Sequence, residues 1–227
     1  MALPSLRVTE VRRRENQANL RAAWGFAEGS GVVARDSTGS GNNLTVDASV
    51  TWPAGHSGGT AIGNSGSGSA HAVWTLSGNE ITMMGWARPL DLTSGTNVAL
   101  FGVWSTPDTT GSTHVAIWAQ RGDFGSSNVL QGNVRIDSNL SPISGPALTL
   151  NAWAHLALSY DGTTIRLYRN GVEVATSTNA GTLASGSNFF CAVPSPTNSQ
   201  VDDIRIYSTA LSTAQIVEAM NNPVAAP

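Results

Sequence analysis

The residues best suited to binding a ligand are tryptophan, arginine, amide and imidazole side chains on predicted strands. In the segment 81–88, Trp86 and Arg88 fall on the opposite parity to the apolar Ile81 and Met83, so they point away from the core. Indole rings stack on sugar rings, whereas guanidinium and amide groups supply directional hydrogen bonds. Within the next predicted strands, polar side chains share one face, namely His114, Trp118 and Gln120, and then Asn133, Arg135 and Asp137.

If these exposed faces coincide, the sequence predicts one concave ligand-binding groove. Its lining would be Trp86, Arg88, His114, Trp118, Gln120 and Arg135. The alternative is that the tryptophans cover a second layer of the core, or are buried at a contact between subunits.

Asp202 and Asp203 are a second group of candidate functional residues, because they are two adjacent carboxylates in a predicted strand. Asp202 has the parity of Ile204 and Ile206 in the last predicted strand, so its carboxylate should face the core unless a bulge changes the parity. A buried carboxylate needs hydrogen-bond donors or a cation. Asp36 opens a polar, glycine-rich turn, where capping of the backbone N–H groups is a simple interpretation.

Groups arranged for catalysis are not found in the sequence. A retaining glycosidase needs two carboxylates about 5 to 5.5 Å apart, whereas Glu28, Glu80 and Glu173 are isolated from one another. The single cysteine, Cys191, lies in an apolar stretch, which predicts an inert buried thiol. We expect His155 to be a structural, hydrogen-bonded residue. The sequence therefore favours a protein that is not an enzyme.

Composition limits the class of protein further. The chain has 227 residues, 24 of them glycine, and only 12% are charged, which favours one large fold of strands and turns. There is no lysine, and the formal net charge is −3. A nearly neutral, slightly acidic chain is a poor candidate for a nucleic-acid-binding protein.

The first 19 residues differ from the rest of the chain. They are basic, and their arginines are Arg7, Arg12, Arg13 and Arg14. We interpret residues 1–19 as an arm that is either a flexible terminus or a docking segment that orders against a partner. No apolar run typical of a secretory signal occurs there, which predicts a protein made and folded in a cytoplasm.

From residue 20 onward, apolar residues alternate with a period of two, which is the pattern of strands. Leu20, Ala22, Trp24 and Phe26 share one face of the first such segment. Further strands are predicted in the segments 81–88, 98–104, 114–120 and 129–137. A glycine-rich loop is predicted over 54–70.

The segment after residue 153 predicts two hairpins and then a helix. Asp161-Gly162 and Asn170-Gly171 are the dipeptides that tight hairpin turns favour. The spacing of Ser212 and Gln215 matches a capping box, which predicts a short helix near the C-terminus. Together these signals predict an antiparallel all-β sandwich of two sheets.

Several motifs in order resemble the laminin-G-like (concanavalin A-like) jelly-roll domains of bacterial and phage surface proteins. The motifs are Ala23–Gly31, Asp36–Asn43, Gly55–Gly63, Ile81–Trp86, Trp153–Gly162, Leu167–Val172 and Val201–Ser212. The resemblance covers about residues 20–221 and implies a jelly roll at 20–221, with the arm before it and a C-terminal tail at 222–227.

The resemblance also implies a metal ion and a ligand class. Domains of this kind often hold a structural Ca²⁺, which here would involve Asp36, Asn43 and one of Asp202 or Asp203. Related sandwich glucanases carry a Glu-x-Asp-x-x-Glu strand, and the chain has no such run. Glycan recognition is favoured over hydrolysis.

These observations lead to one leading hypothesis and two alternatives. The first is a structural or adhesion protein of a phage virion, either a capsid decoration or a minor tail protein. It would assemble in the bacterial cytoplasm, dock to other virion proteins through residues 1–19, form a homo-oligomer and bind cell-surface glycans through the groove. The alternative is a carbohydrate-binding module of a secreted or cell-surface protein. Glycoside hydrolysis is disfavoured.

Overall fold

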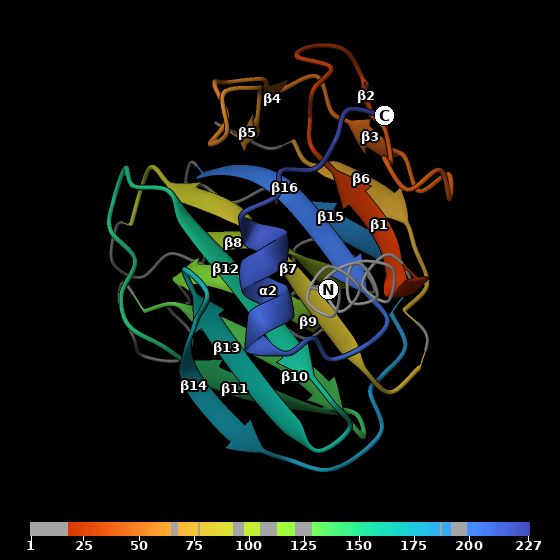
Figure 1. Ribbon diagram of the computed structural model, residues 1–227, viewed down its shortest axis with the longest axis vertical. Coiled ribbons are helices and arrows are strands. Elements are labelled where there is room, and N and C mark those ends of the chain that lie inside the picture. The colour runs from red at the N-terminus through yellow and green to blue at the C-terminus, as the bar shows by residue number, and fades with distance from the viewer. Residues whose placement is uncertain are drawn as a thin grey trace, which may run out of the picture.

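The computed structural model describes residues 18–64, 68–76, 78–92, 98–104, 113–120, 129–186, 188–191 and 199–227. Two antiparallel sheets make up the fold, as predicted, and a short helix lies near the C-terminus (Figure 1). Arg7, Arg12, Arg13 and Arg14 lie outside the described residues. None of the described helices has the length and hydropathy needed to cross a membrane.

The first sheet, called sheet A, has β7 and β16 at its centre. Its strands, in spatial order, are β14 (Val172–Thr178), β13 (Thr164–Arg169), β12 (Ala154–Tyr160), β7 (Ile81–Pro89), β16 (Ser199–Tyr207), β5 (Ile62–Asn64) and β4 (Val50–Thr51). β1 (Leu20–Trp24) also pairs with β16. β5 lies inside the segment that the glycines predict as a loop, so that expectation is corrected over three residues.

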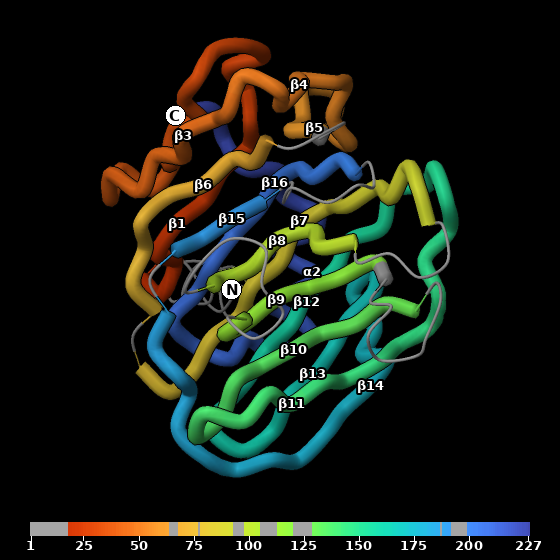
Figure 2. The backbone as a smooth tube through the Cα atoms, turned by 180° about the vertical axis from the view of Figure 1, so that it is seen from behind, coloured from red at the N-terminus to blue at the C-terminus, as the bar shows by residue number. Residues whose placement is uncertain are grey.

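The second sheet, sheet B, faces the viewer in Figure 2. Its strands, in spatial order, are β11 (Asn139–Ser144), β10 (Gln131–Ile136), β9 (Thr113–Gln120), β8 (Val98–Trp104), β15 (Asn188–Cys191), β6 (Ala70–Val73), β3 (Leu44–Val46) and β2 (Val33–Ala34).

The core fills the space between the sheets. Trp24 of β1 is fully buried and stacks on Phe189 of β15, with ring centroids 4.7 Å apart. This contact joins sheet A to sheet B. The alternation predicted for the first strand is confirmed for Ala22, Trp24 and Phe26, which all belong to the core. Leu20 instead packs against a cluster on the outer face of sheet A, because the pairing with β16 shifts register between Leu20 and Ala22.

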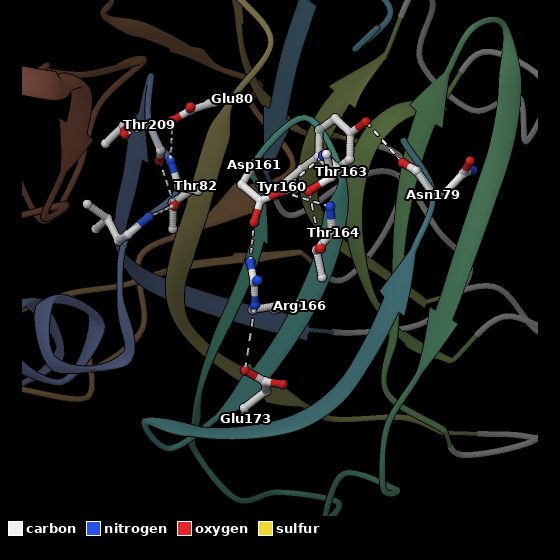
Figure 3. Close-up of polar contacts among 12 residues, drawn as sticks. Glu80, Thr82, Tyr160, Asp161, Thr163, Thr164, Arg166, Glu173, Asn179 and Thr209 are labelled. Atoms are coloured by element: carbon white, nitrogen blue, oxygen red, sulfur yellow. Dashed lines mark hydrogen bonds and ion pairs between the residues drawn. The ribbon is translucent and has the colours of Figure 1, made fainter. Parts of the chain in front are cut away.

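The two predicted hairpins are present. Gly162 and Asn170 have positive φ angles of 88° and 51°, as tight turns require. The Asp161 carboxylate accepts hydrogen bonds from the backbone N–H of Thr164 (2.8 Å) and from the Arg166 guanidinium (2.6 Å), and Arg166 continues to Glu173 at 3.9 Å (Figure 3). Burial acts to raise the pKa of Asp161, but the bonds from Arg166 and the turn outweigh it and hold that pKa well below its usual range.

The helix α2 (Thr213–Met220) lies on the outer face of sheet A (Figure 1). Its buried Ile216 packs in a cluster with Met84, Ala157, Tyr168, Tyr207 and Leu211. The predicted capping box is confirmed, since Ser212 and Gln215 exchange side-chain and backbone hydrogen bonds. Thr82 of β7 fixes the start of the helix by donating to the Thr209 carbonyl and accepting from Leu211 N–H (Figure 3).

Residues after the helix return across the sandwich toward β2 and β3. The Val224 N–H donates to Asp203 (2.8 Å), and the Ala225 carbonyl accepts from the Ser37 hydroxyl (2.8 Å). The C-terminus therefore lies beside the first strands (Figure 1).

Candidate functional site

The predicted groove residues lie on two different sheets. Trp86 and Arg88 belong to β7 in sheet A, whereas His114 and Trp118 belong to β9, and Arg135 to β10, in sheet B. The expectation of one shared groove is therefore wrong. Strand parity tells which residues share a face, but it does not tell which sheet a strand joins. Gln120 is the last residue of β9, and its side chain lies outside the described part.

The outer face of sheet B carries the larger group of candidate residues. Val115, Ile117 and Val134 point into the core, so their neighbours along β9 and β10 point outward. The strand register places one outward row across five strands, which is His71, Phe190, Gly102, Ala116 and Asn133. Residues paired in this way share a face of the sheet.

Three aromatic rings surround the small residues of this row. Trp104 lies edge-on to Trp118, with centroids 6.0 Å apart at 81°, and edge-on to Phe190, also at 6.0 Å. Gly102 keeps the floor between them flat, because a Cβ there would lie 2.5 Å from the Val115 carbonyl oxygen. We call these residues, with Asn133 and Gln131, the Trp118 face. The rings are buried, and Trp118 is 6% exposed.

The polar part of the Trp118 face lies on β10. Asn133 is 0% exposed, and neither its Oδ1 nor its Nδ2 has a hydrogen-bond partner within the described ranges. Gln131, two residues earlier and paired with Trp118, leaves its Oε1 without a partner there. A buried amide without partners costs about 1–3 kcal/mol. Asn133 and Gln131 are therefore the polar candidate residues of this face.

Arginine and histidine lie at the end of the same face. Arg135 donates from Nε to the Thr113 carbonyl and from Nη1 to the Ser138 carbonyl, both at 2.8 Å. Burial and the nearby Arg135 charge lower the pKa of His114, so His114 is neutral at pH 7. The sequence pattern predicts His114, Trp118, Asn133 and Arg135 on these strands, whereas Trp104, Phe190 and Gln131 were not predicted to share the face.

A different arrangement surrounds Trp86 on sheet A. The His56 imidazole stacks on the Trp86 indole, with centroids 3.4 Å apart and planes 11° apart. His155, the register partner of Trp86 on β12, lies edge-on to it at 5.4 Å. The expectation that His155 is hydrogen-bonded is wrong for the ring, because neither ring nitrogen has a partner in the described structure. Arg88 donates to the Asn151 carbonyl at 3.0 Å.

Both aspartates point outward, which corrects the inward orientation that strand parity predicts for Asp202 and agrees with the parity of Asp203. A β-bulge interrupts the pairing of β16 with β7 between Asp202 and Arg205, and Asp203 has a φ of 50°. The extra residue reverses the alternation, so Ile204 still reaches the core while both carboxylates lie on the outer side. Asp202 accepts from the His56 N–H at 2.8 Å. Burial and the Asp203 charge raise the pKa of Asp202 to about 7.

The predicted Ca²⁺ ligands have protein donors of their own. In Asp36, Oδ1 accepts from the Ala23 N–H, the Thr38 N–H and the Thr38 hydroxyl, and Oδ2 accepts from the Asn42 N–H. The Asn43 side-chain oxygen accepts from the Asp36 N–H. Oxygens surrounded by N–H donors fit turn capping better than a cation. In the described ranges, no three His, Cys, Asp or Glu side chains gather closely enough to hold a metal ion.

The groups that could act as nucleophiles or acids are engaged elsewhere. Glu28 accepts from the Arg35 N–H, Glu80 from the Thr209 hydroxyl, and Glu173 lies beside Arg166. Burial raises the pKa of the Cys191 thiol far above its usual value, which confirms an inert thiol. The three glutamates belong to separate parts of the fold.

The stacked sheets and the outward aromatic face define a concanavalin A-like sandwich. Residues 62–217, more than half of the chain, match the family model Laminin_G_3, described as "Concanavalin A-like lectin/glucanases superfamily". The chain belongs to this family. The search of curated proteins gave no match.

Solved structures with the same fold include domains that bind carbohydrates. Domain 4 of AbnA, a GH43 extracellular arabinanase from Geobacillus stearothermophilus solved with arabinotriose, has a TM-score of 0.66 and 23% identity, over 88% of this chain and 98% of that one. The ligand binding domain of botulinum neurotoxin serotype D, solved with N-acetylneuraminic acid, has a TM-score of 0.72 and 9% identity, over 91% of this chain and 52% of that one.

A third similar structure is the binding domain of Paraclostridial Mosquitocidal Protein 1. Its TM-score is 0.72 at 17% identity, over 90% of this chain and 52% of that chain. The chain thus spans about half the length of the two toxin domains. At these identities, the similarities show that the chain shares the fold of these domains.

Proposed function

We propose that the chain is a non-catalytic glycan-binding domain and that the Trp118 face of sheet B is its binding surface. The single observation that supports this most strongly is Asn133, which is fully buried beside three aromatic rings with both amide atoms lacking partners. Sugar rings match this arrangement, since they have apolar faces for stacking and hydroxyl groups that both donate and accept.

The uncharged character of the polar groups supports a binding role over hydrolysis. Asn133 and Gln131 can each donate and accept a hydrogen bond, but neither can transfer a proton or act as a nucleophile. No aspartate or glutamate lies on the described strands β8, β9 or β10. The carboxylate pair that a glycosidase requires is therefore missing from this part of the face.

Replacing Asn133 with alanine should weaken glycan binding by at least 10-fold, because it removes the amide oxygen and the amide NH₂ that would pair with sugar hydroxyls. Trp118→Ala should weaken it similarly by removing a stacking ring. Retention on a glycan array, followed by calorimetric titration of any retained glycan, measures both effects.

Asn139→Ala is the matched control, since Asn139 is an exposed residue of the adjacent β11. It should bind as the unchanged chain does. If the unchanged protein retains no glycan, or if Asn133→Ala binds normally, the proposal is wrong.

We further propose that this domain acts on a phage virion surface, attached through residues 1–19, as a capsid decoration or minor tail protein. Support comes from the basic residues of that segment, which would complement an acidic particle surface. Virion partners, the homo-oligomer and the virion location all stay predictions, as does the alternative of a module in a secreted or cell-surface protein.

Removing residues 1–19 should abolish incorporation into the particle while leaving the thermal unfolding of the sandwich nearly unchanged. Sedimentation of assembled particles followed by immunodetection of the chain measures incorporation. Substituting only Arg12, Arg13 and Arg14 with glutamine tests the charge separately. Normal incorporation of the truncated chain would exclude the docking role.

A further inference from the structure

Three aromatic side chains gather on the outer face of sheet A, on the opposite side of the sandwich from the Trp118 face. Trp86 is half-buried in β7, and Trp153, also half-buried, directly precedes β12. The exposed His56 imidazole lies 3.4 Å from the Trp86 ring centroid and 6.1 Å edge-on from that of Trp153. We call these three residues the Trp86 notch.

His56 reaches the notch from a loop whose backbone is held firmly. The His56 N–H donates to Asp202 Oδ2 at 2.8 Å, and the Asp202 carboxylate also accepts from the Ser57 N–H. Gly55 permits this approach, because a Cβ there would lie 2.5 Å from the same carboxylate oxygen. The loop is therefore anchored through its backbone. The imidazole is held chiefly by stacking and by one contact of 3.2 Å to the Ser57 hydroxyl.

His155 lies beside Trp86 on the neighbouring strand β12, and its ring nitrogens, Nδ1 and Nε2, lack hydrogen-bond partners among the described residues. The residue is 0% exposed. Burial, together with the charges of Arg205 and His56, lowers its pKa to about 3. The neutral ring thus offers one donor and one acceptor. The His155 ring, unpartnered within the described ranges, supports a ligand site independently of the aromatic stack, because burying a polar ring without hydrogen-bond partners costs free energy.

We propose that the Trp86 notch is a second sugar-binding site, in which a sugar ring takes the place of the His56 imidazole on Trp86 and places a hydroxyl within reach of His155. The His56 ring shows that a flat ring fits between Trp86 and Trp153. A sugar ring presents a comparable apolar face, and its hydroxyls can use both His155 nitrogens. This site goes beyond the proposed function, because it lies on the other sheet.

Two sites on opposite faces would let one domain contact two glycan chains. Linked binding events raise the overall avidity well above the affinity of either site. His56 then acts as an internal competitor, since any sugar must displace it. Removal of the imidazole should therefore raise the affinity of the notch.

The test uses the full chain with ¹⁵N-labelled tryptophan, whose indole N–H signals are observed by NMR. The probes are arabinotriose, maltotriose and sialyllactose, titrated separately. We expect at least one of them to shift the Trp86 and Trp153 signals, in addition to those of the Trp118 face. His56→Ala should tighten sugar binding at the notch about 2- to 10-fold. This range corresponds to the free energy of one aromatic stacking contact, which the sugar would no longer have to break.

Thr176→Ala is the control, because Thr176 is an exposed residue of β14 at the edge of the same sheet and its replacement keeps the His56 imidazole and its contact with Ser57. It should leave the affinity within about 2-fold, a change below 0.5 kcal/mol. Shifts of Trp104 and Trp118 without shifts of Trp86 and Trp153 would overturn this inference and leave the proposed function standing. Shifts confined to Trp86 and Trp153 would support the inference and count against the Trp118 face. If His56→Ala binds the sugar more weakly than the unchanged chain, the claim that a sugar takes the place of the His56 imidazole is wrong.

Discussion

Replacing Trp24 with alanine should lower the free energy of unfolding by about 3–5 kcal/mol, which is the usual range for removing a large buried aromatic side chain. Trp24 is fully buried, stacks on Phe189 across the two sheets, and donates from its indole N–H to the Asn42 carbonyl at 2.8 Å. Alanine leaves a cavity between the layers and a carbonyl without its donor. Urea unfolding followed by fluorescence and circular dichroism measures the change.

Two further variants separate the contributions of packing and hydrogen bonding. Trp24→Phe keeps a stacked ring and loses the indole N–H, so it should cost about 1–2 kcal/mol. Trp74→Ala removes a tryptophan that is only half-buried at the edge of the core, and it should cost less than Trp24→Ala. A loss below 1 kcal/mol in Trp24→Ala would show that this contact does not join the sheets.

Trp24 also shows why so much of the fold could be predicted from the sequence. In its strand, Ala22 and Trp24 belong to the core between the sheets while Ala23 does not, and such a period of two is a local property that needs no knowledge of distant partners. The same holds for the hairpin turns at Gly162 and Asn170, where positive φ angles restrict the choice of residue. The capping box of Ser212 and Gln215 is likewise contained within four residues.

The site depends on long-range pairing, which is where the predictions were wrong. Trp86 and Trp118 have similar local patterns, yet β7 pairs with β12 and β16 whereas β9 pairs with β8 and β10. The chain passes from sheet A to sheet B between β7 and β8, and the alternation within a strand does not show where such a crossover occurs. Asp202 shows a second reason for error. One bulge reverses which face of the sheet every earlier residue of the strand points to, and the sequence does not reveal where a bulge occurs.

The same long-range pairing explains why the polar residues without partners could not be recognised beforehand. Asn133 is an ordinary outward residue of β10 until the register places it beside Ala116 and Gly102. His155 similarly depends on Trp86 and on the loop that brings His56 over the sheet. The chemistry of each face therefore arises from side chains on different strands, which only the pairing of the strands brings together.

Replacing Asp202 with asparagine should stabilise the protein at pH 8 and leave its stability nearly unchanged at pH 4. The carboxyl is 3% exposed, and burial together with the Asp203 charge raises its pKa to about 7, against the N–H donors of His56, Asp203 and Ser57. The folded state therefore binds this proton more tightly than the unfolded state, whose pKa is near the ordinary 3.8. Stability from this group is present below about pH 4 and is lost as the pH rises to about 7.

Asparagine keeps an oxygen to accept the His56 N–H and never ionises, so the free energy of unfolding of the variant should exceed that of the original chain by up to about 4 kcal/mol at pH 8, which corresponds to a pKa difference of about three units. Thermal and urea unfolding at pH 4, 6 and 8, with and without EDTA, measure the difference. Glu218→Gln removes the same charge from the half-buried helix surface and should change stability by less than about 0.5 kcal/mol. If Asp202 instead held the Ca²⁺ that the family resemblance implies, the asparagine variant would be the less stable protein at pH 8, and EDTA would lower the melting temperature of the original chain alone.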